Sequence, residues 1–165
     1  MQNRIQKITR AGVIAAIYIA LTLLIQPIGY GTVQFRVAEM LTILPVYMPE
    51  AIPGLAVGCF VSNLVGLSTG ANPAGGLDLL IGTAATLAAA VLTYLLRDIR
   101  FKKLPILATL PPVIVNAIAI GAELAVVYGG LPWYVHMRGV AAGQFAACTI
   151  CGTLLCAALN KVKKL

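Results

Sequence analysis

The chain contains few charged residues and few of the side chains on which most enzymes depend. Only 10% of its 165 residues are charged, five residues are acidic, and His136 is the single histidine. It has no G-x-x-x-x-G-K-[ST] loop for a nucleoside triphosphate, no G-x-S-x-G nucleophile elbow and no H-E-x-x-H zinc motif. These absences argue against an enzyme, predict no cofactor, and indicate that the chain has no nucleotide-binding loop with which to supply energy.

Hydrophobic residues, in contrast, make up 60% of the chain, and its mean hydropathy of +0.94 is far outside the range of a soluble domain of this size. Apolar runs near helix-spanning length recur along it. We therefore predict an all-α polytopic membrane protein with a single transmembrane domain over residues 1–165. Six spans are expected, at 8–28, 32–48, 52–67, 78–96, 105–128 and 140–160.

The second and third spans are near the short end of what crosses a bilayer, so a re-entrant pair is an alternative for them. This alternative changes the number of crossings but not the side on which the chain emerges. The charge bias described next is compatible with both arrangements.

Basic residues gather on one side of this arrangement. Ten of the twelve lysines and arginines lie there: Arg4, Lys7, Arg10, Arg97, Arg100, Lys102, Lys103, Lys161, Lys163 and Lys164. The positive-inside rule makes that side the cytoplasm and places both termini in it, as expected of a protein of the bacterial cell membrane. The net charge of +7 therefore indicates membrane edges and a lipid bilayer, not a nucleic acid partner.

The four cysteines all fall inside apolar segments, where a free cysteine behaves as a small hydrophobic residue. Cys148 and Cys151 form a C-x-x-C in the middle of an expected helix, with no second ligand pair nearby. Because zinc requires four ligands and a redox pair requires access, we expect no metal or redox site.

The stretch 31–53, GTVQFRVAEMLTILPVYMPEAIP, places two charges at the start of an apolar segment. On one helix, Arg36 and Glu39 are three residues apart and share a face, while three prolines interrupt the apolar run that follows. An ionisable pair on an interrupted helix in lipid indicates a binding site. The alternative is a salt bridge that stabilises the end of a helix.

Further polar side chains are expected within or beside the spans, mostly in their outer halves. Asn63 is alone in the third span, where an interhelical hydrogen bond is the common role. Asp78 begins the fourth span, where it serves equally well as a helix cap. Asn116 and Glu123, seven residues apart, project from one face of the fifth span.

Three more features complete the predicted site. Trp133 lies in an aromatic-bearing loop at 129–139, where an interfacial belt is the alternative role, and Gln144 lies in the sixth span. The turn-rich loop at 68–77, STGANPAGGL, is a possible lid. Carboxylates, an arginine, amides and aromatics around a pocket that opens outward suit a small polar or aromatic solute.

Small residues line the early part of the first span. Ala11 and Ala15 are four residues apart, as are Gly12 and Ala16, and this spacing lets another helix approach closely. The partner helix is either internal, which the sequence favours, or part of another protein.

Four segments resemble the QueT family of queuosine-precursor transporters: FRVAEMLTILP at 35–45, PEAIPGLAVGCFVSNL at 49–64, GLDLLIGTAATLAA at 76–89 and PPVIVNAIAIG at 111–121. The resemblance extends over nearly the whole chain, and its F-R-x-x-E and P-x-x-x-N-A blocks are the more specific parts. Such proteins are substrate-binding S components of energy-coupling-factor (ECF) transporters. The resemblance thus implies a six-helix S-component fold, a deazaguanine-type base as ligand, and a partner module of one transmembrane coupling protein and two ATPases.

The resemblance also assigns roles to residues. It supports Arg36, Glu39, Asn63, Asp78 and Asn116 as motif positions, and makes Ala11 and Ala15 the face for the coupling protein. There is one departure: where the family opens its last helix with a Gly-Glu pair, this chain has Gly143 and Gln144. The carboxylate that binds the base would then come from Glu123 or Glu39. Alternative functions are an S component for another vitamin and a small structural or regulatory membrane protein.

Overall fold

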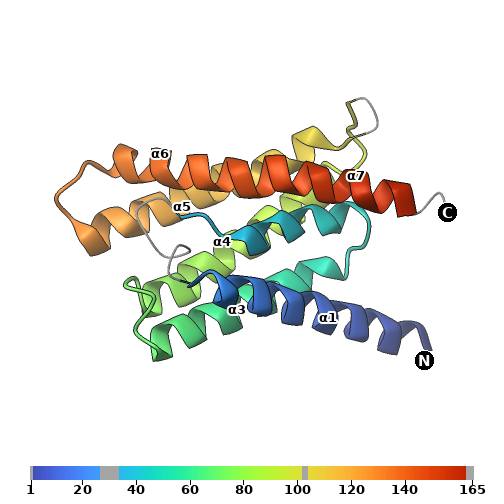
Figure 1. Ribbon diagram of the computed structural model, residues 1–165, viewed down its shortest axis with the longest axis horizontal. Helices are drawn as coiled ribbons and strands as arrows, with labels where there is room; N and C mark the ends of the chain where they lie inside the picture. Colours follow the sequence, from blue (N-terminus) through green and yellow to red (C-terminus); the bar gives the residue numbers. More distant parts are fainter. Residues whose placement is uncertain (1, 27–33, 102–103, 163–165) are drawn as a thin grey trace.

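The computed structural model describes residues 2–26, 34–101 and 104–162 (Figure 1). The expected boundary between the first two spans, at 28–32, lies outside these ranges, as do Lys102, Lys103, Lys163 and Lys164. The elements in chain order are α1 (Gln2–Leu24), the 3-10 helix η1 (Val37–Val46), α3 (Ala51–Ser68), α4 (Gly76–Leu95), the 3-10 turn η2 (Ile106–Thr109), α5 (Leu110–Tyr128), α6 (Trp133–Gln144), the π-helical segment η3 (Phe145–Cys151) and α7 (Gly152–Val162).

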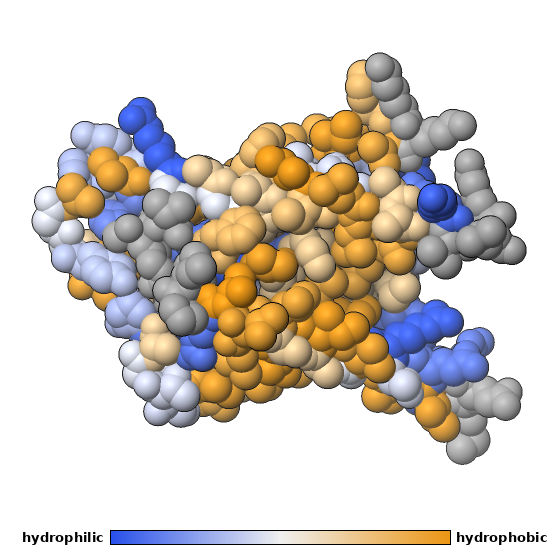
Figure 2. Space-filling model, viewed as in Figure 1, coloured by the Kyte–Doolittle hydropathy of each residue, from blue (hydrophilic) through white to orange (hydrophobic). Residues whose placement is uncertain are grey.

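Long apolar helices dominate the described chain. Five helical stretches are long and apolar enough to cross a membrane, and they span Asn3–Leu24, Ala51–Ser68, Gly76–Leu95, Ile106–Tyr128 and Trp133–Lys161; Val37–Val46 is a shorter apolar helix. On the face seen in Figure 2, a hydrophobic band lies between two more hydrophilic ends. The prediction of an all-α, six-helix polytopic membrane protein is confirmed.

Helices α1 and α3 run in the same direction, and two contacts show this. Near the termini, Arg10 on α1 pairs with Glu50 beside the start of α3 at 3.0 Å. At the opposite end, Gln26 donates a hydrogen bond to Thr69, just after α3, at 3.0 Å. Because α1 and α3 are parallel, the chain between them has to return along the bundle, and η1 makes this return (Figure 1). The structure therefore has two separate passes here instead of the re-entrant pair.

The second pass is not the α-helix that the sequence predicted. It consists of a non-helical segment at 34–36 followed by η1, which contains Pro45. A 3-10 helix rises about 2 Å per residue, so the ten residues of η1 extend roughly 20 Å. Three residues outside the helix add at most roughly 10 Å. Together they approach the thickness of a hydrocarbon core of about 30 Å, which explains how so short a helix completes a pass.

The last pass is longer than predicted. α6 begins at Trp133, so the aromatic loop expected at 129–139 ends at Pro132 and the helix expected from 140 starts seven residues earlier. Gly129 and Gly130 have positive φ angles of 58° and 68°, which form the turn after α5. The helix then continues through η3 to Val162 (Figure 1).

Glycines on α3 let it lie against α1. A methyl group on Gly54 would approach the Ala11 carbonyl oxygen to 2.7 Å, and one on Gly58 would approach Tyr18 Cβ to 2.8 Å. The small residues of α1 therefore pack against two glycines of α3, which is the packing within the chain that the sequence favoured.

Candidate functional site

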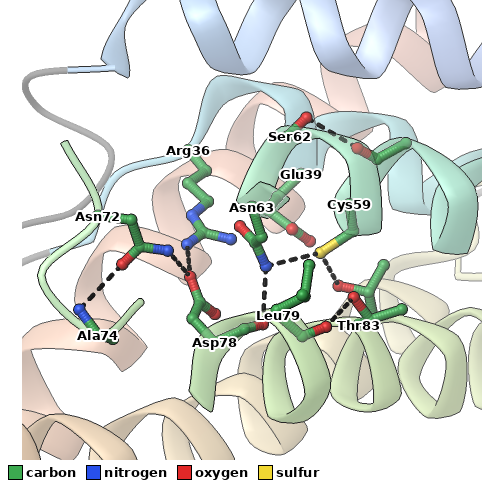
Figure 3. A network of polar contacts seen from close by, with 12 residues as sticks. Arg36, Glu39, Cys59, Ser62, Asn63, Asn72, Ala74, Asp78, Leu79 and Thr83 are labelled. Atoms are coloured by element: carbon green, nitrogen blue, oxygen red, sulfur yellow. Dashed lines mark hydrogen bonds and ion pairs between the residues drawn. The ribbon is translucent and has the colours of Figure 1, made fainter. Parts of the chain in front are cut away.

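A buried ion pair lies where the extended segment meets the start of α4. Arg36 Nη2 is 2.6 Å from Asp78 Oδ2, and the two residues are 4% and 0% exposed (Figure 3). Asn72, in the loop before α4, donates to the same carboxylate oxygen at 2.7 Å and accepts from the Ala74 amide at 3.1 Å. The loop predicted as a possible lid therefore supplies a buried hydrogen-bond donor to the Asp78 carboxylate.

Asp78 does not serve as a helix cap. It is the third residue of α4, the N-cap position is Gly75, and Asp78 Oδ2 receives Arg36 and Asn72. The structure therefore does not show the helix-capping role that was the alternative for Asp78. The carboxylate instead compensates the charge of a buried arginine, which would otherwise be costly in an apolar bundle.

Asn63 joins α3 to the same group. Its Nδ2 donates to the Asp78 backbone carbonyl at 2.8 Å and approaches Cys59 Sγ at 3.6 Å (Figure 3). Gly82, one turn further along α4, leaves room for this contact, because a methyl group there would lie 2.9 Å from Asn63 Nδ2 and would collide with the Asp78 carboxylate. Asn63 has the interhelical role that is common for amides in membranes.

Glu39 is buried beside this network but has a different partner. Tyr18 on α1 donates its hydroxyl to Glu39 Oε1. Arg36 lies before η1 in an extended conformation, with φ of −101° and ψ of 103°, and its carbonyl accepts from the Glu39 amide at 3.0 Å. The two residues are therefore not on one helical face as predicted, and Arg36 instead reaches an acid on another helix.

A second polar group lies on α5 and α6. Asn116, Glu123, His136 and Gln144 are all buried. Helix α5 packs against both α4 and α6, so this group lies on helices next to the first one. Gln144 accepts a hydrogen bond from Cys148 at 3.1 Å, and the His136 ring stacks on Tyr128 with centroids 6.3 Å apart.

The extended segment lies against α6 as well as α4. A side chain at Gly143 would collide with the backbone carbonyl of Gln34, so glycine is required there for the close approach. Because Arg36 in the same segment pairs with α4, the segment lies between the two polar groups. Seven of the eight predicted site residues are buried inside the bundle: Arg36, Glu39, Asn63, Asp78, Asn116, Glu123 and Gln144.

Trp133 is the exception. It is the first residue of α6, its side chain is 60% exposed, and it makes an edge-to-face contact with Tyr134 at 6.3 Å. Its position at an outer end suits the interfacial belt given as the alternative.

Sequence reasoning missed three residues of the network: Tyr18, Asn72 and His136. Tyr18 is a polar-tipped aromatic inside the first apolar run, and such residues find a hydrogen-bond partner when buried. Asn72 precedes a proline in a turn-rich loop, and His136 is the single histidine. Residue type was a usable signal for each of them.

Several acceptor atoms of the site have no partner within the described chain. These buried atoms are Glu39 Oε2, Asn63 Oδ1, Asp78 Oδ1 and both oxygens of Glu123, along with both nitrogens of His136. In residues 2–26, 34–101 and 104–162, no group of three or more histidine, cysteine or acidic residues is placed to hold a metal ion. Buried acceptors without a partner are unusual in proteins, and each one could receive a hydrogen bond.

A separate groove of about 530 Å³ lies at the end of the bundle that holds the termini, between α1 and α3. Its lining includes Ala11, Gly12 and Ala15 from α1, with Pro53 and Val57 from α3. The Ala15 side chain is 6% exposed, whereas a methyl group on Gly12 would have no neighbour within 4 Å. The groove is largely apolar and lies away from the polar network, so it does not suit a ligand rich in donors.

Comparisons with known proteins agree with each other. The family model described as QueT transporter matches residues 8–161. A protein of Lactococcus lactis subsp. cremoris (strain MG1363) named Queuosine precursor transporter QueT is 31% identical over 104 residues, which is 62% of this chain and 57% of that protein. The chain thus spans a little over half the length of this curated relative. No solved structure matches the chain.

Proposed function

Because the chain belongs to the QueT transporter family, we propose that it is the membrane subunit that captures a queuosine precursor for import. Members of this family are transporters, not enzymes. The proposed ligand is a deazaguanine-type base. The proposed role is that of an S component, which binds its ligand outside and depends on partner subunits for energy.

The observation that carries this proposal is the buried polar network inside an apolar bundle. Burying charged and polar groups without full compensation costs several kcal/mol, so a membrane protein retains them where a ligand completes their hydrogen bonds. The network lies near the start of α4 and the α3–α4 loop, at the end opposite the termini (Figure 1). An opening at that end would admit a solute from the side opposite the termini.

The orientation follows from charge. The first half of α1, the segment after α4 and the end of α7 lie near the end that holds the termini (Figure 1). In the described chain these segments contain Arg4, Lys7, Arg10, Arg97, Arg100 and Lys161. The positive-inside rule makes that end cytoplasmic and the network periplasmic or extracellular. In a cysteine-free background, Ser68→Cys should react with an impermeant thiol reagent in intact cells, and Arg100→Cys should not. Labelling of Arg100→Cys alone would reverse the orientation.

Binding by the purified protein tests the function directly. Titration calorimetry in detergent should detect a 7-deazaguanine base. Glu123→Gln replaces one acceptor oxygen by a donor and should weaken binding by about 1.5 to 3 kcal/mol, the range for hydrogen bonds that involve charge. Glu50→Gln, the same change at the opposite end of the bundle, should leave binding unchanged.

The outcomes separate the alternatives. Binding of another vitamin without the base would retain the S-component role but change the ligand. Absence of any small ligand would favour a structural or regulatory protein. An unchanged dissociation constant for Glu123→Gln would remove this residue from the site.

Energy coupling is proposed to come from a module of one transmembrane coupling protein and two ATPases. The groove between α1 and α3 is the proposed docking surface, with Ala11 and Ala15 in its lining. Because Ala15 is already packed against α3, a large residue there would disturb the bundle itself. Gly12 is the sharper test, since it lines the groove and a Cβ atom added there would have no neighbour within 4 Å.

Gly12→Leu should therefore keep base binding and thermal stability but lose co-purification with the ATPases and lose uptake in cells. Ala15→Leu is the matched comparison and should lower stability as well. If Gly12→Leu still assembles and transports, the groove is not the docking surface.

A further inference from the structure

The groove between α1 and α3 stays open because the residues that line it are small. Ala11, Gly12 and Ala15 line it from α1, and Gly54 lines it from α3. A methyl group on Gly54 would approach the Ala11 carbonyl oxygen to 2.7 Å, so the two helices are already in contact and cannot close the groove by moving together. A methyl group on Gly12, in contrast, would have no neighbour within 4 Å. The groove therefore needs an occupant from outside the described chain.

This groove faces the membrane and has nearly the length of one leaflet. Both α1 and α3 are long and apolar enough to cross a membrane, and the lining residues Ile8 and Val57 have exposed side chains. From Lys7 to Ala15, α1 rises roughly 12 Å. Half of a hydrocarbon core is about 15 Å thick. The groove thus begins at the basic end of α1 and extends through most of the adjacent leaflet.

A lipid acyl chain suits the groove in size and polarity. The volume of about 530 Å³ lies within the range of about 300 to 1,000 Å³ that is usual for small-molecule sites. The lining is apolar apart from two charged residues, Lys7 and Glu50. A flexible hydrocarbon chain can fill such a space, because dispersion contacts require no polar partner.

The charges at the basic end of the groove favour an anionic headgroup. The Glu50 carboxylate is paired with Arg10 at 3.0 Å. Lys7 and Arg4, three residues apart on one helix face, are exposed and have no ion pair within the described residues. Three basic side chains thus stand against one acid, and basic residues beside a membrane span attract anionic lipids.

From the open apolar groove and the two unpaired cations at its end, we propose that the free subunit binds one anionic phospholipid here. One acyl chain occupies the groove, and the phosphate of the headgroup binds Arg4 and Lys7. Lipid binding does not depend on the proposed function. Displacement of the lipid by the coupling protein does depend on it, because both would occupy the same groove.

Two lipids with the same acyl chains and different headgroup charge test the proposal on the wild-type protein. Phosphatidylglycerol is anionic, whereas phosphatidylcholine has no net charge. In mild detergent, native mass spectrometry should show one bound phosphatidylglycerol, with roughly thirtyfold tighter binding than phosphatidylcholine, the factor expected for two basic residues near an anionic lipid. This comparison needs no variant, so it does not depend on the folding of a mutant.

A photoreactive phosphatidylglycerol locates the bound chain. With a diazirine in one acyl chain, it should crosslink to α1 between Lys7 and Ala15 and to α3 between Pro53 and Val57. Crosslinks spread evenly over the exposed faces of all the long helices would show ordinary boundary lipid only and would overturn the proposal.

Charge variants test the headgroup contacts. Arg4→Gln combined with Lys7→Gln should weaken binding of phosphatidylglycerol by roughly thirtyfold and leave phosphatidylcholine unchanged. Arg100→Gln combined with Lys161→Gln removes the same charge from residues that do not line the groove, and should leave both lipids unchanged. Equal effects of the two double variants would remove the headgroup from Arg4 and Lys7.

Glycine variants test the acyl chain. Gly12→Leu should fill the groove and abolish the bound phosphatidylglycerol. Gly76→Leu is the matched control, because Gly76 also has open space around it but begins α4 instead of lining the groove. It should leave lipid binding unchanged.

The possible failures are distinguishable. Equal binding of the two lipids, or retention of phosphatidylglycerol by Gly12→Leu, overturns the proposal and leaves base binding untouched. A dimer that lacks bound lipid and is lost in Gly12→Leu would assign the groove to a second copy of the chain. Assembly with the coupling protein should release the phosphatidylglycerol, and its retention in the assembled complex would contradict displacement.

Discussion

Replacing Asp78 by asparagine removes the charge that compensates Arg36 and keeps the shape of the side chain. The two groups are 2.6 Å apart and both side chains are almost fully buried. Breaking a buried ion pair by removing one partner typically costs about 3 to 5 kcal/mol of unfolding free energy. Two further acids, Glu39 and Glu123, are buried in the bundle and compensate part of the lost charge. We therefore expect a value of about 3 kcal/mol, the low end of that range.

The matched control is Asp98→Asn. Asp98 is 3.7 Å from Arg97, and its side chain is 82% exposed, so the same chemical change there should cost less than about 1 kcal/mol. Unfolding can be followed by far-ultraviolet circular dichroism during titration with a denaturing detergent.

A double-mutant cycle completes the test of the ion pair. Arg36→Gln with Asp78→Asn should cost less than the sum of the two single changes, because the double variant leaves neither charge unpaired. The reasoning is refuted if Asp78→Asn is no more destabilising than Asp98→Asn, or if the two single effects simply add.

Three further changes test neighbouring parts of the structure. Gly143→Ala should destabilise the bundle by about 1 to 3 kcal/mol in the same titration, because its methyl group collides with the extended segment, whereas Gly76→Ala, which meets no neighbour, should not. Tyr18→Phe leaves the accepting oxygen of Glu39 without its donor and should cost about 1.5 to 3 kcal/mol, and unchanged stability would show that this hydrogen bond does not stabilise the bundle. A hydrogen bond to its own backbone amide, and then the hydrogen bond with Arg10, lower the pKa of Glu50 from 4.5. The ionised Glu50 side chain therefore stabilises the fold above pH 4.5, and this stabilisation is lost as the pH falls below that value. The Glu50→Gln variant should lack this part of the acid dependence.

Hydropathy was sufficient to predict the long helices, because each helix has to span the hydrocarbon core of the membrane. Helix α3 was expected at 52–67 and spans Ala51–Ser68, and α4 was expected at 78–96 and spans Gly76–Leu95. The same signal did not distinguish a 3-10 helix from an α-helix in the second pass, since both bury an apolar segment of similar composition. The start of α6 was missed because a polar, aromatic first turn resembles a loop.

The sequence indicated which polar residues lie inside the bundle better than it indicated their contacts. Amides and acids inside apolar runs are informative by type, and seven of the eight candidates are buried together. The pairing of Arg36 was not predictable, because its partner Asp78 is 42 residues away while Glu39 lies at a favourable helical spacing. Only the extended conformation of Arg36 explains why the more distant acid is its partner.

The interruption of the second pass and the position of Arg36 in the polar site both follow from the non-helical segment at 34–36. In a membrane, non-helical backbone is tolerated only where protein or a solvated cavity surrounds it, because lipid offers no hydrogen bonds. The segment at 34–36 satisfies this condition, since Gln34 and Arg36 are both buried between α4 and α6. An α-helix of the same length would rise only about 1.5 Å per residue and would leave the pass shorter. The longer rise of η1 therefore lets the chain complete the pass while residues 34–36 remain non-helical, and this segment places Arg36 beside buried acids that have oxygens without a partner in the described chain.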